Sequence, residues 1–249
     1  MKIKYVTMSG CNESTDIEGL VALLRRYPFA EIGIQVNEKK CAGGSSRRGW
    51  IYALASYLKY KEQVINAALH VNPDWVTEFC QGSMPHGLQD LLDLRNYYGC
   101  PFFQRVQLNF RIGRDPMPDA DKLMALIHNF SSRRFILSFN ESNAQFIREL
   151  YRRGAKFDLL FDSSHGEGIA PKERPVSVYN DVLQGYAGGI SPENVAEVLD
   201  GIAEKETLVP NFVGVAIDAE GKLKEQGAFS IDRGRAYLSA AEKWMKEHA

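Results

Sequence analysis

The sequence lacks the features that mark membrane and secreted proteins. No apolar run approaches the roughly 20 residues needed to span a bilayer, so we expect no membrane partner. Only 4 of the 249 residues are cysteine, and they are widely spaced without a Cys-x-x-Cys pair. This spacing predicts reduced thiols. Because no charged segment followed by an apolar stretch opens the chain, we expect a cytoplasmic protein.

An excess of one charge sign is also lacking. The chain has 30 Lys and Arg against 31 Asp and Glu, a formal net charge of -1, which supplies no basic surface for nucleic acid. Low-complexity tracts, short internal repeats and linker-like segments are missing as well. A hydrophobic content of 45% provides ample material for a core. We therefore expect one soluble domain over residues 1–249, as a monomer or homodimer.

Short apolar runs alternate with longer helical patterns from one end of the chain to the other. The eight expected strands are Ile3–Met8, Glu31–Val36, Ala67–Asn72, Arg105–Phe110, Phe135–Phe139, Phe157–Phe161, Gly185–Gly188 and Phe212–Ile217. The expected helices lie around Leu20–Leu24, Ile51–Leu58, Leu88–Arg95, Leu123–Phe130, Ala144–Arg153, Val195–Ala203 and Arg235–Lys246. The helix after the sixth strand is weak because prolines interrupt it.

Eight strand-helix units predict a single (β/α)8 TIM barrel of the α/β class. A doubly wound open sheet is the alternative, but it calls for Gly-x-Gly-x-x-Gly after the first strand, where this chain has Ser9-Gly10-Cys11-Asn12-Glu13. Two insertions, Asn37–Gly49 and Gly166–Val178, follow the second and sixth strands. In a barrel both emerge at the C-terminal face, where enzymes of this fold carry their chemistry.

The seventh strand runs into Gly188-Gly189-Ile190-Ser191-Pro192, a tight turn that opens a helix. Glycine amides can approach a ligand closely, Ser191 can cap the helix, and Pro192 suits its first position. The positive end of the helix dipole then favours an anion, although a plain turn is the alternative. The eighth loop could add the backbone of Gly221, because phosphate sites of barrels commonly use the loops after strands seven and eight.

Polar residues at strand ends are candidates for catalysis and substrate binding. Asp162 follows an apolar strand, where a desolvated carboxyl can hold a proton near neutral pH, although a turn aspartate is the alternative. His165 is either a base or a solvated loop histidine. Asn37 and Asn140 end strands and could bind ligand hydroxyls or shape ordinary turns.

The chain resembles the phosphoribosylanthranilate isomerases of tryptophan biosynthesis, which are eightfold βα barrels. Segments 187–195, 106–108, 69–72 and 160–162 are similar to that family's phosphate loop, fourth strand, third strand and Leu-Leu-Asp. The resemblance implies Asp162 as general acid, Arg47 or Arg48 for a substrate carboxylate, and Gln107 as a substrate contact. It also implies a phosphate site at Gly166, Gly168, Gly188 and Gly189, with no metal or cofactor.

The chain departs from that family at the base. Ser9 replaces its first-strand cysteine, and an unperturbed hydroxyl is a poor base. Cys11 stands two residues on and could reach the same space, although a lone cysteine is more often incidental. In the eighth strand, Ala216 to Glu220 replace the family's Asp-Val-Ser-Ser-Gly, and there Asp218 and Glu220 would repel a dianion unless they face solvent.

The resulting expectation is an aldose-ketose isomerase of a small phosphorylated sugar. Asp162 would donate a proton, and Cys11, Ser9 or His165 would be the base. The alternatives are a lyase or aldolase on the same scaffold, for which no strand-end lysine is evident, and a catalytically idle barrel that only binds a sugar phosphate.

Overall fold

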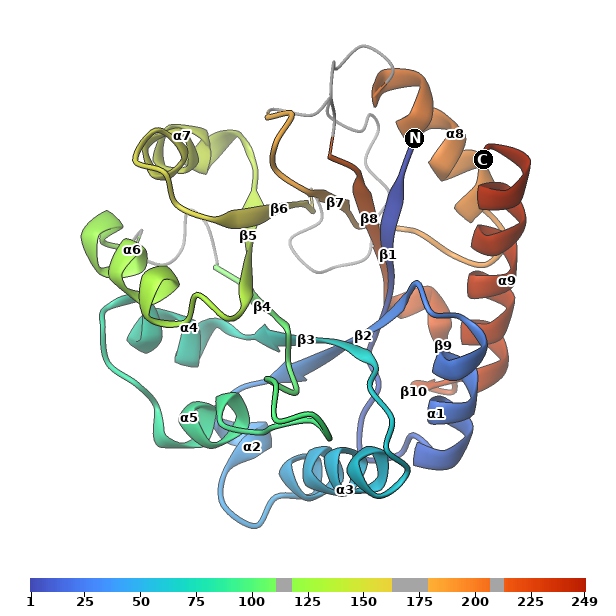
Figure 1. Ribbon diagram of the computed structural model, residues 1–249, viewed down its shortest axis with the longest axis horizontal. Coiled ribbons are helices and arrows are strands. Elements are labelled where there is room, and N and C mark those ends of the chain that lie inside the picture. The colour runs from blue at the N-terminus through green and yellow to red at the C-terminus, as the bar shows by residue number, and fades with distance from the viewer. Residues whose placement is uncertain (111–117, 163–178, 207–212) are drawn as a thin grey trace. The chain divides into compact units, whose positions relative to one another are not determined.

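The computed structural model describes residues 1–110, 118–162, 179–206 and 213–249. Its strands, in sequence order, form a closed barrel in which the paired neighbours are parallel (Figure 1). They are β1 (Ile3–Ser9), β2 (Ala30–Val36), β3 (Asn66–Val71), β4 (Arg105–Leu108), β5 (Arg134–Phe139), β6 (Phe157–Phe161), β7 (Gln184–Tyr186) and β8 (Val215–Ala219). The expected TIM barrel is confirmed, and an open sheet is excluded.

The described helices alternate with these strands. They are α1 (Ile17–Arg26), α2 (Glu38–Cys41), α3 (Ser46–Tyr60), α4 (Pro73–Cys80), α5 (His86–Leu92), α6 (Ala120–Asn129), α7 (Ala144–Arg152), α8 (Val195–Glu206) and α9 (Ile231–Glu247). Two short 3₁₀ turns, η1 (Glu141–Asn143) and η2 (Gly221–Leu223), and a hairpin of β9 (Lys224–Glu225) and β10 (Ala228–Phe229) complete the elements. None of the helices described is both long and apolar enough to cross a membrane.

Several expected boundaries are corrected by the structure. The eighth strand runs from Val215 to Ala219 rather than from Phe212 to Ile217, and the seventh ends at Tyr186, which leaves Gly188 in the loop. The expected insertion after β2 holds α2 and the start of α3. Helix α4 was not expected, although Asn72 before Pro73 is a signal for a helix start.

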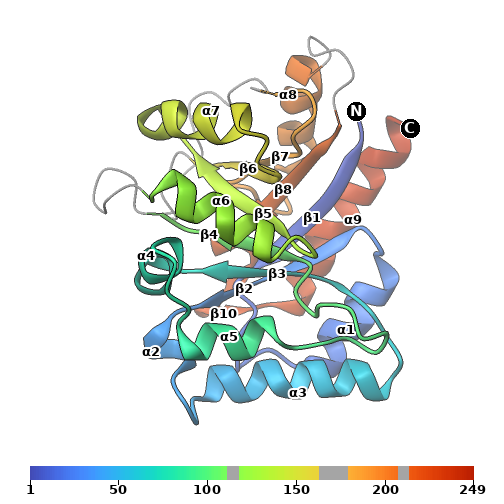
Figure 2. The same ribbon diagram turned by 60° about the vertical axis from the view of Figure 1, so that its left-hand side comes forward.

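Contacts along the chain group into two compact units, 1–33 with 158–249, and 34–157. In the first unit β1 pairs with the beginning of β2 and with β8, while β7 pairs with β6 and β8. Helix α9 packs against both α1 and α8 there. In the second unit β4 lies between β3 and β5, and α6 lies beside α7 (Figure 2).

Alternation along β1 separates an apolar face from a polar one. Met8 points towards α9, since its sulfur lies 3.1 Å from the position that a Cβ on Gly234 would take. Thr7 and Ser9 therefore point the other way, because successive side chains of a strand alternate. Thr7 pairs in register with Glu31 of β2 and Asp218 of β8, which places three buried or half-buried polar residues on one face.

Candidate active site

The ends of β1 and β8 bring a serine and an aspartate together in the first unit. The Ser9 hydroxyl donates to Asp218 Oδ1 at 2.7 Å. Two residues earlier on β1, the Thr7 hydroxyl donates to Glu31 Oε1 at 2.8 Å. Thr7, Ser9 and Glu31 are buried, whereas Asp218 keeps intermediate exposure. Asp218 therefore stands where these hydrogen-bonded groups meet accessible space.

The surroundings of Asp218 favour its protonated form. Burial, and then the charges of Glu220, Glu31 and Asp162, raise the pKa of its carboxyl from 3.8 to about 7. The hydrogen bond from Ser9 acts in the opposite direction, because it stabilises the carboxylate. A carboxyl with a pKa near neutrality can both accept and donate a proton, which is the requirement for general acid-base catalysis.

A lysine from the loop after β8 lies over the end of β1. Lys224 Nζ contacts Glu220 Oε1 at 2.7 Å, and both side chains are half-buried. A Cβ on Gly10 would lie 2.9 Å from Lys224 Cε, and Gly10 has φ +95°, a conformation that favours glycine. Glycine at this position therefore lets the Lys224 side chain cross the backbone directly after Ser9.

The expected acid and base residues fall in different surroundings. Asp162 directly follows β6 and is half-buried; its charge acts on Asp218 within the same unit. Cys11 is fully buried two residues beyond β1, and none of the four cysteines, all of them in the described ranges, forms a disulfide. Ser9 is a hydrogen-bond donor to a carboxylate rather than a solvated hydroxyl. His165, Gly166 and Gly168 lie outside the described residues.

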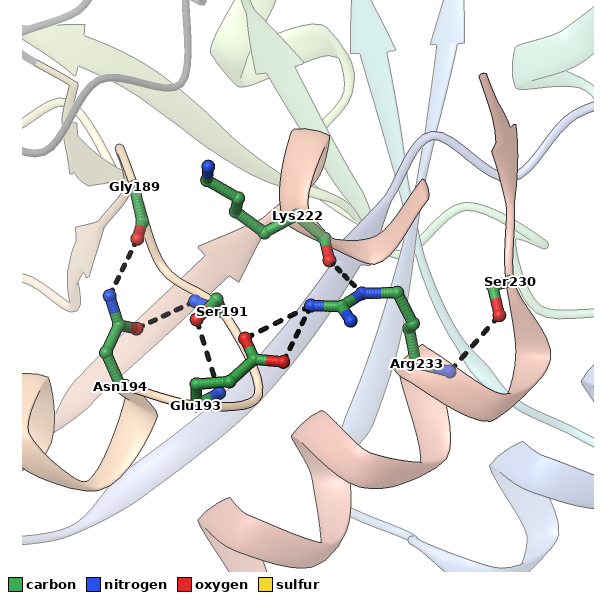
Figure 3. A network of polar contacts seen from close by, with 7 residues as sticks. All are labelled: Gly189, Ser191, Glu193, Asn194, Lys222, Ser230 and Arg233. Atoms are coloured by element: carbon green, nitrogen blue, oxygen red, sulfur yellow. Dashed lines mark hydrogen bonds and ion pairs between the residues drawn. The ribbon is translucent and has the colours of Figure 1, made fainter. Parts of the chain in front are cut away.

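The loop after β7 contains several hydrogen bonds of its own (Figure 3). Gly188 and Gly189 have φ values of +89° and +67°. The Asn194 amide donates to the Gly189 carbonyl at 2.9 Å and accepts from the Ser191 amide at 2.8 Å. Asn194 thus fixes the path of the chain between the glycines and α8.

The expected range of this helix, Val195–Ala203, begins where α8 begins. The expected place of Pro192 at the first helical position is wrong, because Pro192 lies in the preceding turn. The Ser191 hydroxyl accepts from the Glu193 amide at 3.2 Å, two residues on, and the Ser191 carbonyl accepts from Val195 at 3.0 Å. The hydroxyl therefore closes a turn before the helix, and the Asn194 side chain, which accepts from the Ser191 amide, supports the same turn.

Arg233 joins this loop to the loop after β8 (Figure 3). Its Nη2 contacts both carboxylate oxygens of Glu193, at 2.9 and 3.1 Å, and its Nε donates to the Lys222 carbonyl at 2.5 Å. The hydrogen bond with Ser191, and then the Arg233 charge, hold the pKa of Glu193 below its usual range. Gly221, the expected phosphate contact of the eighth loop, begins η2 with open space around its Cα.

The second unit carries a chain of neutral amides at the ends of β3 and β4. Gln107 donates to Asn109 Oδ1 at 2.8 Å, and Asn109 donates to Asn72 Oδ1 at 3.1 Å. His70, which pairs in register with Gln107, is buried, and burial and the charge of Arg105 lower its pKa to about 3. His70 is therefore neutral at physiological pH.

Other residues expected to bind substrate already have protein partners. Arg47 is buried and donates to the Gln35 carbonyl at 2.9 Å, while Arg48 is paired with Asp90 and lies over the Tyr52 ring. The Asn37 side chain accepts from the Lys40 amide and caps α2. The Asn140 side chain accepts from the Ser142 amide. These two asparagines thus perform the turn chemistry that was the alternative.

Sequence reasoning missed the environment of Asp218. The expected eighth strand ended at Ile217, so this residue was placed in the loop beyond it, as a carboxylate that repels phosphate or faces solvent. In the structure it lies within the strand and bonds to a serine 209 positions away. A polar residue at the end of an apolar run was the available signal. Within the described ranges, no group of three or more His, Cys, Asp or Glu side chains is placed to hold a metal ion.

Comparisons with known proteins relate the chain to others by fold. No known family model matches the sequence, and no curated protein matches it. The structure of N-(5'-phosphoribosyl)anthranilate isomerase from Pyrococcus furiosus is similar with a TM-score of 0.52 and 14% identity, over 96% of this chain and 98% of that one. The YdjI aldolase from Escherichia coli K12 is similar with a TM-score of 0.51 and 11% identity, over 98% and 90% of the two chains. These likenesses show a shared TIM-barrel fold with enzymes of two different reactions.

Proposed function

We propose that this chain is an enzyme that interconverts the aldose and ketose forms of a small phosphorylated sugar, with Asp218 as its central proton-transfer group. The observation that carries the proposal is the Asp218 carboxyl at the end of β8, which accepts from Ser9 and has its pKa raised to about 7. Sugar isomerisation needs a group that takes a proton from carbon and returns one near neutral pH, which this carboxyl satisfies.

Two carboxyls of the first unit divide the proton transfers. Asp162 donates a proton to the ring oxygen, and the ring C1–O bond breaks with its electron pair on that oxygen while the lone pair of the glycosidic nitrogen forms a C1=N bond. The Asp218 carboxylate then takes the proton from C2, the electron pair of that C–H bond forms a C1–C2 double bond, and the C1=N pair returns to nitrogen, which gives the enol. The Ser9 hydroxyl stabilises the carboxylate, since it donates to Oδ1. Tautomerisation of the enol, with a proton delivered to C1, completes the ketose.

The phosphate of the substrate binds at the loop of Gly188 and Gly189. Their positive φ values favour glycine, whose backbone amides a ligand can approach closely, and the N-terminus of α8 follows after the turn of Ser191. Binding energy from a phosphate remote from the reacting carbons positions C1 and C2 against the carboxyls. The resemblance to phosphoribosylanthranilate isomerase makes an N-phosphoribosyl arylamine the first substrate of choice.

The test is turnover by the purified protein of a panel that contains this N-glycoside and simple aldose phosphates, followed by NMR in D₂O. An isomerase yields a ketose that carries solvent deuterium at C1. Asp218→Asn should lower the rate by about 10²- to 10⁴-fold, and Asp162→Asn should abolish ring opening. Asp232→Asn, at an exposed aspartate of α9, is the matched control.

The outcomes separate the proposed function from its alternatives. Carbon-carbon cleavage products indicate a lyase or aldolase, whereas ligand-induced thermal stabilisation without product across the panel indicates a binding protein. Full activity of Asp218→Asn contradicts the assigned role of this carboxyl even if the isomerase activity itself is found.

A further inference from the structure

The side chain of Arg233 joins the loop after β7, which holds the proposed phosphate site, to the loop after β8. Arg233 lies on α9, outside both loops, and its guanidinium contacts Glu193 before α8 and the Lys222 carbonyl of η2 at the same time. Its own amide donates to the Ser230 hydroxyl at 3.3 Å, which fixes the start of α9. The side chain of Arg233 is more buried than that of Glu193, 28% against 66% exposed. The guanidinium is thus the inner, fixed partner of this pair.

The contacts of Arg233 use the planar shape of the guanidinium. One nitrogen contacts both oxygens of Glu193 while another donates to a backbone carbonyl. A lysine ammonium has no such fixed fork of donors. The loop ends held in this way are two residues from Ser191 on one side and one residue from Gly221 on the other. Arg233 therefore fixes the separation of the two loops by hydrogen bonds to both.

The Lys222 side chain adds a positive charge to η2, the turn that Arg233 holds. Its carbonyl is bound by Arg233, while its side chain is exposed and extends away from the guanidinium, on the Gly189 side of the view in Figure 3. Among the ion pairs found in the described part of the chain, none involves the Lys222 ammonium. An unneutralised ammonium at this edge favours an anion near the glycine loop.

We propose that Arg233 is a positioning residue for the phosphate site, which ties the loop after β7 to the loop after β8 and thereby places the Lys222 ammonium to contact the phosphate. This inference rests on the proposed function, because it concerns the same phosphate site. The Arg233 guanidinium itself donates to the Glu193 carboxylate and the Lys222 carbonyl and does not contact the ligand. Glu193 is required as the anchor on the other loop, despite its negative charge.

The sign of the Glu193 effect distinguishes positioning from simple charge. If the nearby charges acted only through space, removal of a negative charge by Glu193→Gln would strengthen phosphate binding. Under the positioning role the same substitution weakens binding, because the loop loses its attachment to Arg233. Arg233→Gln weakens phosphate binding under both explanations, so only Glu193→Gln distinguishes positioning from charge.

The experiment is a titration of the intact protein with inorganic phosphate, followed by the amide NMR signals of residues 187–195. Glu193→Gln, Arg233→Gln and Arg233→Lys should each raise the dissociation constant about two- to fivefold, and Lys222→Met should raise it by at least as much. The double variant Glu193→Gln/Arg233→Gln should bind no more weakly than Arg233→Gln alone, since both changes break one connection. Arg235→Gln, at an exposed arginine two residues on, should bind as the wild type does.

The results separate this proposal from the proposed function. Wild-type protein that does not bind phosphate overturns both. Phosphate binding that is unchanged or strengthened in Glu193→Gln overturns only the positioning role and leaves the phosphate site standing. A lower melting temperature of Arg233→Gln with an unchanged dissociation constant shows a purely structural contact, which also overturns it.

Discussion

The Ser9 hydroxyl and the Asp218 carboxylate, 2.7 Å apart, join the two strands at which the first and last segments of the chain meet. The resemblance to the isomerase family placed Ser9 at the position of a catalytic cysteine, and there a serine alone is a poor base. The structure gives that serine a different task. Ser9 donates to the carboxylate form of Asp218, so the residue that titrates is the aspartate.

Removal of the Ser9 hydroxyl should raise the pKa of Asp218 further. The hydrogen bond from Ser9 lowers this pKa because it stabilises the charged carboxylate, and Ser9→Ala removes that stabilisation. We expect the titration midpoint to move to higher pH by up to about one unit. The measurement is a carboxyl ¹³C titration of Asp218 by NMR. Ser239→Ala, an exposed serine of α9, is the control, and a downward shift in Ser9→Ala contradicts the assignment.

Asp218 should also make the stability of the fold depend on pH. Its pKa is raised from 3.8 to about 7, so the folded state holds a proton that the unfolded chain releases from about pH 4 upwards. The stabilisation is complete below the unfolded pKa and is lost as the pH rises towards 7. Over this window the wild type should lose about 1 kcal/mol per pH unit relative to Asp218→Asn.

The measurement is denaturant unfolding of wild type and Asp218→Asn between pH 4 and 8. Only the difference between the two proteins is informative, because other carboxyls and histidines titrate in the same range. Parallel curves for the two proteins throughout that range are the contradicting result.

The close approach of Lys224 to Gly10 predicts a strong cost for a side chain there. Gly10→Ala places a methyl group 2.9 Å from Lys224 Cε and 3.2 Å from Glu220 Cγ, at a backbone φ of +95°. We expect a loss of about 1–3 kcal/mol in the free energy of unfolding. Gly10→Ala/Lys224→Ala relieves the contact but not the backbone strain, so the double variant should recover part of the lost stability. The measurement is chemical denaturation, and the control is Gly221→Ala, where the added Cβ meets open space.

The barrel could be predicted from the sequence because most of its strands lie in short, largely apolar runs, a local property of the chain. The β6 range Phe157–Phe161 was predicted to the residue, since apolar side chains occupy four of its five positions. Asp218 could not be assigned in the same way. Its environment depends on the register between β1 and β8, two strands that are more than 200 residues apart in sequence, and no local pattern encodes that register.

The loop of Gly188 and Gly189, the proposed phosphate loop, could be predicted only in part. Its tight glycine turn was predicted from the local sequence, and the positive φ values of the two glycines confirm that part. The start of α8 at Val195 was predicted, but Pro192 was expected at its first position and lies instead in the turn that Ser191 and Asn194 close. Arg233 also could not be identified, since its partners Glu193 and Lys222 lie 40 and 11 positions away on separate loops.

Tyr237 on α9 offers a test of packing behind the candidate site. Its side chain is fully buried, and no described residue accepts or donates a hydrogen bond at its hydroxyl. Burial, and then the charge of Asp218, raise the pKa of this phenol, so it stays neutral. A buried hydroxyl without a partner costs about 1–3 kcal/mol of desolvation that nothing offsets. Tyr237→Phe removes the hydroxyl, keeps the ring, and should therefore stabilise the fold by about 1 kcal/mol.

The measurement for Tyr237→Phe is again the free energy of unfolding, with Tyr60→Phe, at a largely exposed tyrosine, as the control that should change little. Destabilisation by Tyr237→Phe would show that the hydroxyl has a hydrogen-bond partner in solution.

The pKa of Asp218 supplies a second measurement on the same variant. A neutral phenol without a hydrogen bond to the carboxyl contributes little to its titration, so the midpoint should stay near 7 in Tyr237→Phe. A shift upwards by a unit would instead place the hydroxyl on Asp218 as a donor alongside Ser9.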